Sequence, residues 1–453
     1  MIARVGRAME IRMADEITGT RLGFRWLNLR LQPGLSRTNG RTLLFACLTG
    51  IPFLVIINFI QPYILTTVLD VPRQDQGSIS GNLALFHELI ILLLVGPFGA
   101  LSDRIGRRRI FVAGYIVTGV GLLIYPFATS ALGLALIRVV YAVGASAIIS
   151  VYSVILADYP QEKSRGKLVA ISGMLNGLGI LALTFIGGNL PYWLTDAGYG
   201  PIAAGRIAMA IVAVACATSG IIVAFGLRGG DRGGEAEHRQ PLAHLLRDGV
   251  AAARNPRIAV AYASAFAARG DVVVIGTYVS LWVSQVGINN GMTNAEALQR
   301  AAIIFALIQT AALLMSPVIG ILNDRINRVT ALVVGMGLAA LGYLVFGFQQ
   351  DPTAGAWILI AILLGTGQIA AVLAGTTLVG QEADPRITGA TLGVWSFCGA
   401  VGTMFGSWLG GQLFDLWMPG APFVLMGVLN LLVTIAALVV RLRYPQAGPL
   451  RIS

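Results

Sequence analysis

The sequence predicts an all-α integral membrane protein built from two pseudo-symmetric six-helix bundles. The chain of 453 residues is 56% hydrophobic and only 12% charged, whereas soluble proteins carry about 25% charged residues. It contains twelve apolar runs of the length that crosses a bilayer as a helix, about 20 residues. A motif of the first half of the chain also returns in the second half.

The twelve runs divide into two sets of six. We expect a basic amino-terminal segment (1–42), a first bundle (43–227), a linker (228–257), a second bundle (258–441) and a short tail (442–453). The Gly-rich, charged linker ends in PLAHLLRDGVAAA. A short surface helix can begin there at Pro241, because proline is favoured at the first helical position.

The basic residues predict the orientation in the membrane. Of the 32 Lys and Arg, 27 fall in the termini, the linker and the loops that share their side of the membrane. Cytoplasmic loops carry such an excess, so both termini are expected to be cytoplasmic, in a multi-pass protein of the cytoplasmic (inner) membrane. The net charge of +11 then comes from basic residues that lie on the cytoplasmic side of the lipid bilayer. No nucleic-acid partner is expected. The three cysteines lie singly in apolar runs, so no metal site or cofactor is expected.

The two halves share a loop motif. GALSDRIGRRR (99–109) and GILNDRINRVT (320–330) match at an offset of 221 residues. The matching positions are Gly99, Leu101, Asp103, Arg104, Ile105 and Arg107 with Gly320, Leu322, Asp324, Arg325, Ile326 and Arg328. Arg165 matches Arg386 at the same offset. Two separate loops with one offset indicate duplication of a six-helix unit, and many transporters are built from such halves with a binding site between them.

These motifs resemble those of the major facilitator superfamily. GALSDRIGRRR is similar to its signature in the second-to-third-helix loop. LIRVVYAVGASA (136–147) resembles its fourth-helix motif around an arginine, here Arg138, although Ala142 stands where the family has glycine. DYPQEKSRGK (158–167) resembles the pattern that follows the fourth helix. NGLGILALTFIGGNL (176–190) lacks the proline that family exporters often carry. The resemblance covers nearly the whole chain and implies two bundles that rock around a central cavity.

The loop motif is expected to act in gating. Gly99 permits close helix approach, and Asp103 can interact with the positive amino-terminal end of a neighbouring helix. The resemblance implies that this contact, with Asp158, holds the two halves together when the site faces outward. Arg104 or Arg107 would then pair with Asp158. The alternative is that the arginines only fix the topology.

Five ionisable residues lie inside the predicted spans: His87, Glu88, Arg138, Arg269 and Asp271. A charge at the centre of a bilayer costs from about 3 to more than 10 kcal/mol. At a rise of about 1.5 Å per residue, Arg269 lies about 18 Å from the inner end of its helix, near the midplane. Glu88 and Arg138 share a depth of about 10–12 Å from their outer ends and could pair across the first bundle.

Arg269 and Asp271 are two residues apart, so a regular helix directs them to nearly opposite sides and they cannot satisfy each other. Gly270 between them allows a local break. At least one therefore needs another partner, either a structural ion pair on a neighbouring helix or the substrate. A desolvated Glu88 or Asp271 can carry a coupling proton. His87 is either a proton relay or a packing residue.

The resemblance implies that helices 1, 4, 7 and 10 line the cavity. Polar or aromatic residues suited to such a cavity occur in both halves, although an aromatic residue in a bundle is more often a packing residue. They are Asn58, Gln61, Tyr63, Tyr141, Tyr278, Trp282, Gln309, Gln368 and Trp395.

The predicted function is secondary active transport of a small organic solute by alternating access, coupled to protons, in a monomer. Arg138 and Arg269, with the missing proline, favour uptake of an organic anion by symport. The alternative is efflux of a lipophilic, drug-like compound by proton antiport, and a remote one is a transporter-derived sensor or assembly factor. The chain has no hydrolase, zinc-peptidase or phosphate-loop motif, so no enzyme is expected.

Overall fold

The computed structural model describes residues 21–22, 29–228 and 242–444. Within this part of the chain, 12 helices are long and apolar enough to cross a membrane. They confirm the predicted all-α, multi-pass membrane fold. Much of the predicted amino-terminal segment, residues 229–241 of the linker and most of the tail lie outside the described residues.

The first half contains six spans. Its first span begins at Arg37, rather than near residue 43, because Ser36 and Asn39 form a capping box that starts the helix there. The elements are β1 (Arg21–Leu22), β2 (Leu29–Arg30), α2 (Arg37–Thr49), α3 (Pro52–Tyr63), the π-helix η1 (Ile64–Val68), η2 (Arg73–Asp75), α4 (Gln76–Ile105), α5 (Arg107–Ile124), η3 (Tyr125–Phe127), α6 (Ala131–Asp158), α7 (Glu162–Asp196) and α8 (Pro201–Gly226).

The second half repeats this pattern. A linker helix follows Pro241, as predicted, and six further spans come after it. The elements are α9 (Leu242–Ala251), η4 (Ala252–Arg254), α10 (Pro256–Val274), the π-helix η5 (Ile275–Val279), α11 (Ser280–Asn289), α12 (Asn294–Arg325), α13 (Arg328–Gly347), α14 (Trp357–Glu382), α15 (Thr388–Leu416) and α16 (Ala421–Arg443). The offset of 221 residues seen in the loop motif recurs in the starts of α5 and α13 and in the ends of the first and seventh spans, Val68 and Asn289.

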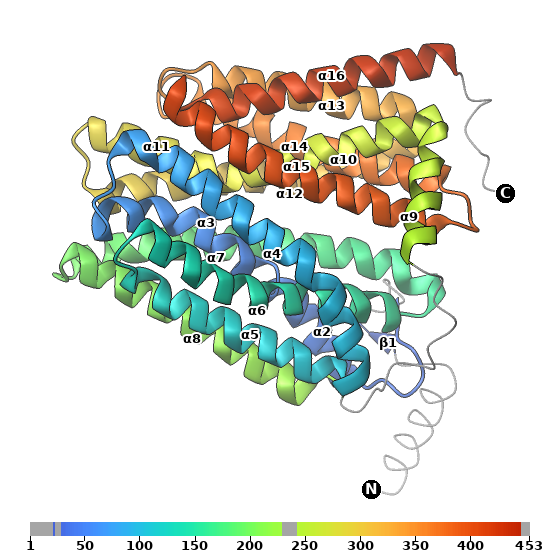
Figure 1. The fold of residues 1–453 in the computed structure, drawn as a ribbon, viewed down its shortest axis with the longest axis horizontal. Helices are drawn as coiled ribbons and strands as arrows, with labels where there is room; N and C mark the ends of the chain where they lie inside the picture. The colour runs from blue at the N-terminus through green and yellow to red at the C-terminus, as the bar shows by residue number, and fades with distance from the viewer. Residues whose placement is uncertain (1–20, 23–28, 229–241, 445–453) are drawn as a thin grey trace, which may run out of the picture.

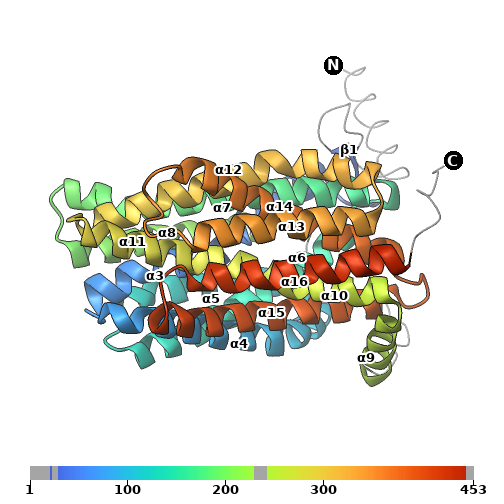
Figure 2. The same cartoon turned by 90° about the horizontal axis from the view of Figure 1, so that it is seen from above.

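The two halves lie side by side with their helices roughly parallel to one long axis, as Figures 1 and 2 show. α4 packs along α15, and α7 packs along α12. We call the end of the molecule that carries α9 the linker end; it lies at the right of Figure 1. The opposite end, which carries Asp75, Asn290 and Trp417, is the far end. α4 runs from the far end to the linker end, and α15 runs the other way.

Candidate functional site

Arg138 on α6 lies in the interior of the first half, with 1% of its surface exposed. Its Nη2 donates hydrogen bonds to Asn58 Oδ1 at 2.8 Å and to Gln61 Oε1. Its guanidinium also lies 5.8 Å from the ring centroid of Tyr125. Nε and Nη1 are buried without a hydrogen-bond partner. A guanidinium has five N–H groups, so the three on Nε and Nη1 remain able to bind an acceptor.

Gln61 connects Arg138 to its surroundings. Its Nε2 donates to Ser80 Oγ at 2.7 Å, and its Oε1 also accepts from the Tyr125 hydroxyl at 3.0 Å. These bonds fix the orientation of the amide that accepts from Arg138. Ser80 and Tyr125 were not among the predicted site residues. Ser80 lies seven residues before His87, on the same face of a helix, which is the signal that could have identified it.

His87 and Glu88 differ in their surroundings. His87 is buried, and its ring centroid lies 5.3 Å from that of Tyr141, whose hydroxyl donates to Phe53 O at 2.6 Å. Glu88 is half-buried, and the positive charges of Arg269 and Arg138 lie within electrostatic range of its carboxylate. The hydrogen bonds of Arg138 go to Asn58 and Gln61 instead of to Glu88. The carboxylate of Glu88 is thus influenced by arginine charges from both halves, although no ion pair within 4.0 Å joins it to either one.

Arg269 and Asp271 point to different surroundings, as their spacing predicts. Asp271 is fully buried, and both its oxygens accept hydrogen bonds from Asn430 Nδ2 on α16, at 2.9 and 3.0 Å. Arg269 is exposed, and its stem lies against Gly399 on α15. Asp271 is therefore engaged inside the second half, whereas Arg269 is accessible. Asn430 was missed, although it is the lone asparagine in the last apolar run.

The irregularity in this span lies beyond Gly270. α10 remains α-helical to Val274, and the π-helix η5 follows at Ile275–Val279. Gly270 instead permits close packing, since a Cβ atom there would lie 2.6 Å from Met426 Cε and 3.1 Å from Gly402 O. π-Helical turns are frequent at functional sites.

The remaining candidates form two groups: residues that pack or hydrogen-bond within one half, and residues with a buried polar atom that lacks a hydrogen-bond partner. The Tyr63 hydroxyl donates to Pro201 O at 2.8 Å inside the first half. The Tyr278 hydroxyl donates to Ser407 O. Trp282 packs against Phe346 and Phe423 inside the second half. Three others keep a buried polar atom without a hydrogen-bond partner: Gln309 Oε1, Gln368 Oε1 and Trp395 Nε1.

The loop motif ties helix ends together within the first half. Arg107, at the start of α5, contacts Asp158 at the end of α6 and lies 3.8 Å from Asp103. Of the two arginines considered as partners of Asp158, Arg107 makes this contact. Arg104 is exposed, and Arg165 forms an ion pair with Glu162 at 2.9 Å.

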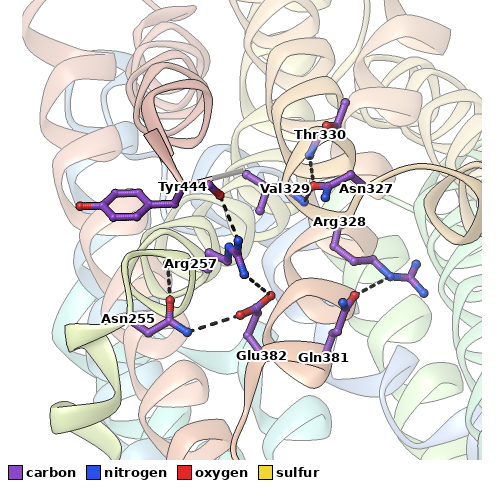
Figure 3. Close-up of polar contacts among 9 residues, drawn as sticks. All are labelled: Asn255, Arg257, Asn327, Arg328, Val329, Thr330, Gln381, Glu382 and Tyr444. Atoms are coloured by element: carbon purple, nitrogen blue, oxygen red, sulfur yellow. Dashed lines mark hydrogen bonds and ion pairs between the residues drawn. The ribbon is translucent and has the colours of Figure 1, made fainter. Parts of the chain in front are cut away.

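The second half has the corresponding arrangement. Arg328 Nη1 lies 3.0 Å from Asp324, and its Nε donates to Gln381 Oε1 at the end of α14 (Figure 3). In both halves an arginine that starts the third span thus bridges the repeated aspartate and the end of the fourth span. The other repeated residues of this half make no such bridge. Arg325 ends α12, and the Arg386 backbone amide donates to Asp384. Gly320 lies in an open position, since no atom lies within 4 Å of a Cβ atom placed there.

A second set of contacts joins more helix ends of this half. Arg257, near the start of α10, lies 3.5 Å from Glu382 on α14 and donates to Tyr444 O, just after α16, at 3.0 Å. Asn255 Nδ2 also donates to Glu382 (Figure 3). The linker end of the second half is therefore held together internally.

The two halves meet through polar contacts at the far end. Within the part of the chain that the structure describes, every hydrogen bond between the halves lies there: Arg73 with Asn289, Gln285 with Arg73 and Gln76, Asn294 with Thr67, Gln299 with Asn189, and Asp415 with Gly77 and Ser78. These contacts close the far end. Among the described residues, no hydrogen bond joins the two halves at the linker end.

Asp415 makes the most direct of these contacts. Its Oδ1 accepts from Gly77 N at 2.9 Å and its Oδ2 from Ser78 N at 2.6 Å. The first turn of α4 has no acidic residue, and its N-cap, Asp75, makes no side-chain cap. A carboxylate of the second half therefore caps a helix of the first half and complements its dipole.

Glycines allow the backbones of α4 and α15 to cross beside this cap. A Cβ atom at Gly411 would collide with Gly77 O, and one at Gly81 would lie 2.5 Å from Ser407 O. No larger residue fits at this crossing without displacing one half from the other.

No group of three or more His, Cys, Asp or Glu residues that could hold a metal ion occurs in the described part of the chain. The central residues of the described part are arginine donors, one half-buried carboxylate and neutral amides.

Comparisons with known proteins agree with this architecture. A model of the Major Facilitator Superfamily matches residues 42–400 and 297–452. Magnetosome protein MamH of Paramagnetospirillum magneticum is 28% identical over 395 residues, which are 85% of this chain and 88% of MamH. Magnetosome protein MamZ of the same organism is 28% identical over 402 residues, and the match covers 83% of this chain and 59% of MamZ.

Solved structures show the same fold. A mutant of the nucleoside transporter NupG superposes with a TM-score of 0.72 at 12% identity, over 89% of this chain and 99% of NupG. A POT family transporter in complex with 5-aminolevulinic acid gives a TM-score of 0.68 at 15% identity, over 91% of this chain and 98% of that transporter.

Proposed function

Because the chain belongs to the Major Facilitator Superfamily, whose fold is that of transporters, we propose that it is a secondary active transporter that takes up a small organic anion together with protons. One observation carries the proposal: Nε and Nη1 of the buried Arg138 have no acceptor. A buried cationic donor without a partner is costly, and an anionic substrate would supply the missing acceptor. Arg269, exposed on the facing half, would be the second cationic contact.

Glu88 is the group we assign to proton coupling. Its carboxylate lies within electrostatic range of both arginines, so its negative charge would oppose the binding of an anionic substrate to them. Protonation of Glu88 would release the arginines to bind the anion, which couples the two cargoes. Asp271 is less suited to this role because both its oxygens already accept hydrogen bonds from Asn430.

We propose that the linker end faces the cytoplasm, since it carries the excess of basic residues, and that the membrane is the cytoplasmic one. The closed far end then faces outward, and the structure corresponds to an inward-facing state. Each bundle would move as a unit, because contacts such as Arg107 with Asp158 and Arg328 with Gln381 tie its helix ends internally.

We propose that the far end and the linker end each act as a gate. Each gate would be closed by an aspartate that caps the start of a helix in the other half. In this state Asp415, at the end of α15, caps the start of α4. The start of α15 at Thr388 has no side-chain cap and no acidic residue in its first turn. In the outward-facing state, Asp103 near the end of α4 would cap the start of α15, which we assign as the neighbouring helix in the contact that the family resemblance implies.

The test is the internal pH of proteoliposomes while a panel of organic anions and lipophilic cations is added outside. Internal acidification by one anion, lost in Glu88→Gln and retained in the matched Asp271→Asn, is the expected result. Alkalinisation by a lipophilic cation would instead establish antiport and the efflux alternative. Radiolabel uptake without any pH change would overturn proton coupling.

A further inference from the structure

A cavity of about 460 Å³ opens at the linker end of the first half, away from the central site. It lies where the α4–α5 junction meets the ends of α6 and α8. Five of its ten lining residues are arginines: Arg104, Arg107, Arg108, Arg109 and Arg228. A loop that only fixes topology needs basic residues on one side of the membrane, but it does not need them to converge on one cavity.

Few acidic groups of the described residues balance the four arginines at the α4–α5 junction, Arg104 and Arg107 to Arg109. Arg107 contacts Asp158 and Asp103. Arg108 donates a long hydrogen bond of 3.4 Å to the backbone carbonyl of Leu227, and Arg109 donates one of 3.5 Å to that of Ile105. Arg104, Arg108 and Arg109 form no ion pair with any residue that the structure describes. These three arginines therefore give the cavity an excess of positive charge.

The start of α5 adds to this excess. The helix begins with three consecutive arginines, its N-cap Gly106 offers no side-chain cap, and its first turn contains no acidic residue. Cations at the positive end of a helix dipole destabilise the helix. The Nε atom of Arg107 is also buried without a hydrogen-bond partner. A bound anion would offset both unfavourable features.

The other walls are apolar or aromatic. Ile105, Ile155, Tyr159 and Leu227 line the cavity beside the guanidinium groups. Guanidinium forks match the oxygens of a phosphate group in a bidentate manner, and the apolar walls suit a ligand that continues into a hydrocarbon or glycerol portion. We propose that this cavity binds a phosphate ester, supplied either by the headgroup of an anionic phospholipid or by a soluble phosphate compound.

The ligand would bind within one bundle. The lining residues come from α4, α5, α6 and α8 and the residues that adjoin them, all in the first half. Binding would therefore stiffen the linker end of the first half without joining it to the second. This binding would not depend on which substrate the protein transports.

The test uses the purified full chain in a neutral maltoside detergent at low ionic strength. The thermal unfolding midpoint is recorded against increasing dioctanoyl phosphatidylglycerol, dioctanoyl phosphatidylcholine, inorganic phosphate and glycerol 3-phosphate. We expect saturable stabilisation by phosphatidylglycerol that exceeds stabilisation by phosphatidylcholine. Stabilisation by phosphatidylglycerol alone identifies a lipid headgroup as the source. Equal stabilisation by glycerol 3-phosphate identifies a soluble ester.

Variants locate the site. Arg108→Gln with Arg109→Gln should weaken the apparent affinity by roughly tenfold or more, because bidentate charged contacts are lost. The matched control, Arg254→Gln with Arg443→Gln, removes two exposed arginines from the linker end of the second half and should leave the affinity unchanged. If the double cavity variant does not fold, Arg104→Gln should still weaken binding. Equal effects of the two phospholipids, no stabilisation, or unchanged affinity in the cavity variants would overturn the proposal.

Discussion

Arg138 combines two properties that rarely occur together in a packed protein interior. It is almost wholly buried, and two of its three nitrogens have no acceptor. The third nitrogen donates hydrogen bonds to Asn58 Oδ1 and Gln61 Oε1, so the guanidinium is oriented before any ligand arrives. Such preorganisation reduces the entropy lost on binding.

This predicts that Arg138→Lys will fold but bind substrate poorly. Lysine can still donate to Gln61, but it lacks the planar fork that presents Nε and Nη1 together. We expect the KM for uptake to rise by roughly tenfold, which corresponds to about 1.4 kcal/mol. The control is Arg206→Lys, an exposed arginine of the same half. An unchanged KM in Arg138→Lys would leave Arg138 with a structural role.

For Asp271 we predict that substitution lowers the stability of the protein rather than its affinity for substrate. Asp271→Ala leaves Asn430 Nδ2 with only its bond to Met426 O, and an unsatisfied buried donor costs about 1–3 kcal/mol. Asp271→Asn retains an acceptor oxygen and should transport nearly as well as the unmodified chain. Thermal unfolding in detergent measures the first effect, with the exposed Asp196→Ala as its control. Loss of proton movement in a well-folded Asp271→Asn would transfer the coupling role from Glu88 to Asp271.

At the scale of elements, the crossing of α4 and α15 depends on the absence of side chains. The far end closes because Gly77 and Gly81 meet Gly411 and Ser407 backbone to backbone. Packing this close is typical of helix pairs in membranes, where small residues replace the hydrophobic driving force. The same pair of helices thus forms both a structural contact and the proposed outer gate.

Gly411→Val should therefore force the far end apart. Its added methyl groups have no space beside Gly77, so the population should shift away from the state described. Distances between spin labels at Gln74→Cys and Met418→Cys, measured by electron paramagnetic resonance, should increase. Gly96→Val on α4 is the control, since nothing lies within 4 Å of a Cβ atom there. Identical distance distributions in Gly411→Val and the unmodified chain would show that the crossing does not control closure.

At the scale of the whole molecule, the two aspartates at opposite ends of the α4–α15 pair should act in opposite directions. Asp415→Asn weakens the charged cap at the far end and should favour the outward-facing state. Asp103→Asn should favour the inward-facing state and slow exchange. The double variant should return the equilibrium toward that of the unmodified chain. The same spin-label distances measure all three, and shifts in one common direction would contradict the two-gate proposal.

Composition, run length and the repeated loop motif were sufficient to predict the membrane fold and its two-fold duplication. They also predicted that Arg269 and Asp271 would separate, because helical spacing determines direction. They could not predict that Asn430 faces Asp271 or that Asp415 caps α4. Those contacts depend on how each helix is rotated about its axis against a helix that is distant in the sequence. A membrane helix has apolar residues on all sides, so its hydrophobic pattern says little about that rotation.

The reciprocal placement of Asp415 and Asp103 has a thermodynamic consequence. If each end state is held by one aspartate on one helix terminus, breaking one such contact while making the other changes the free energy of the protein very little. The unloaded carrier would then visit both orientations with comparable frequency. Net flux would be decided by the concentrations of cargo and protons on the two sides of the membrane, and reversing those gradients would reverse the flow.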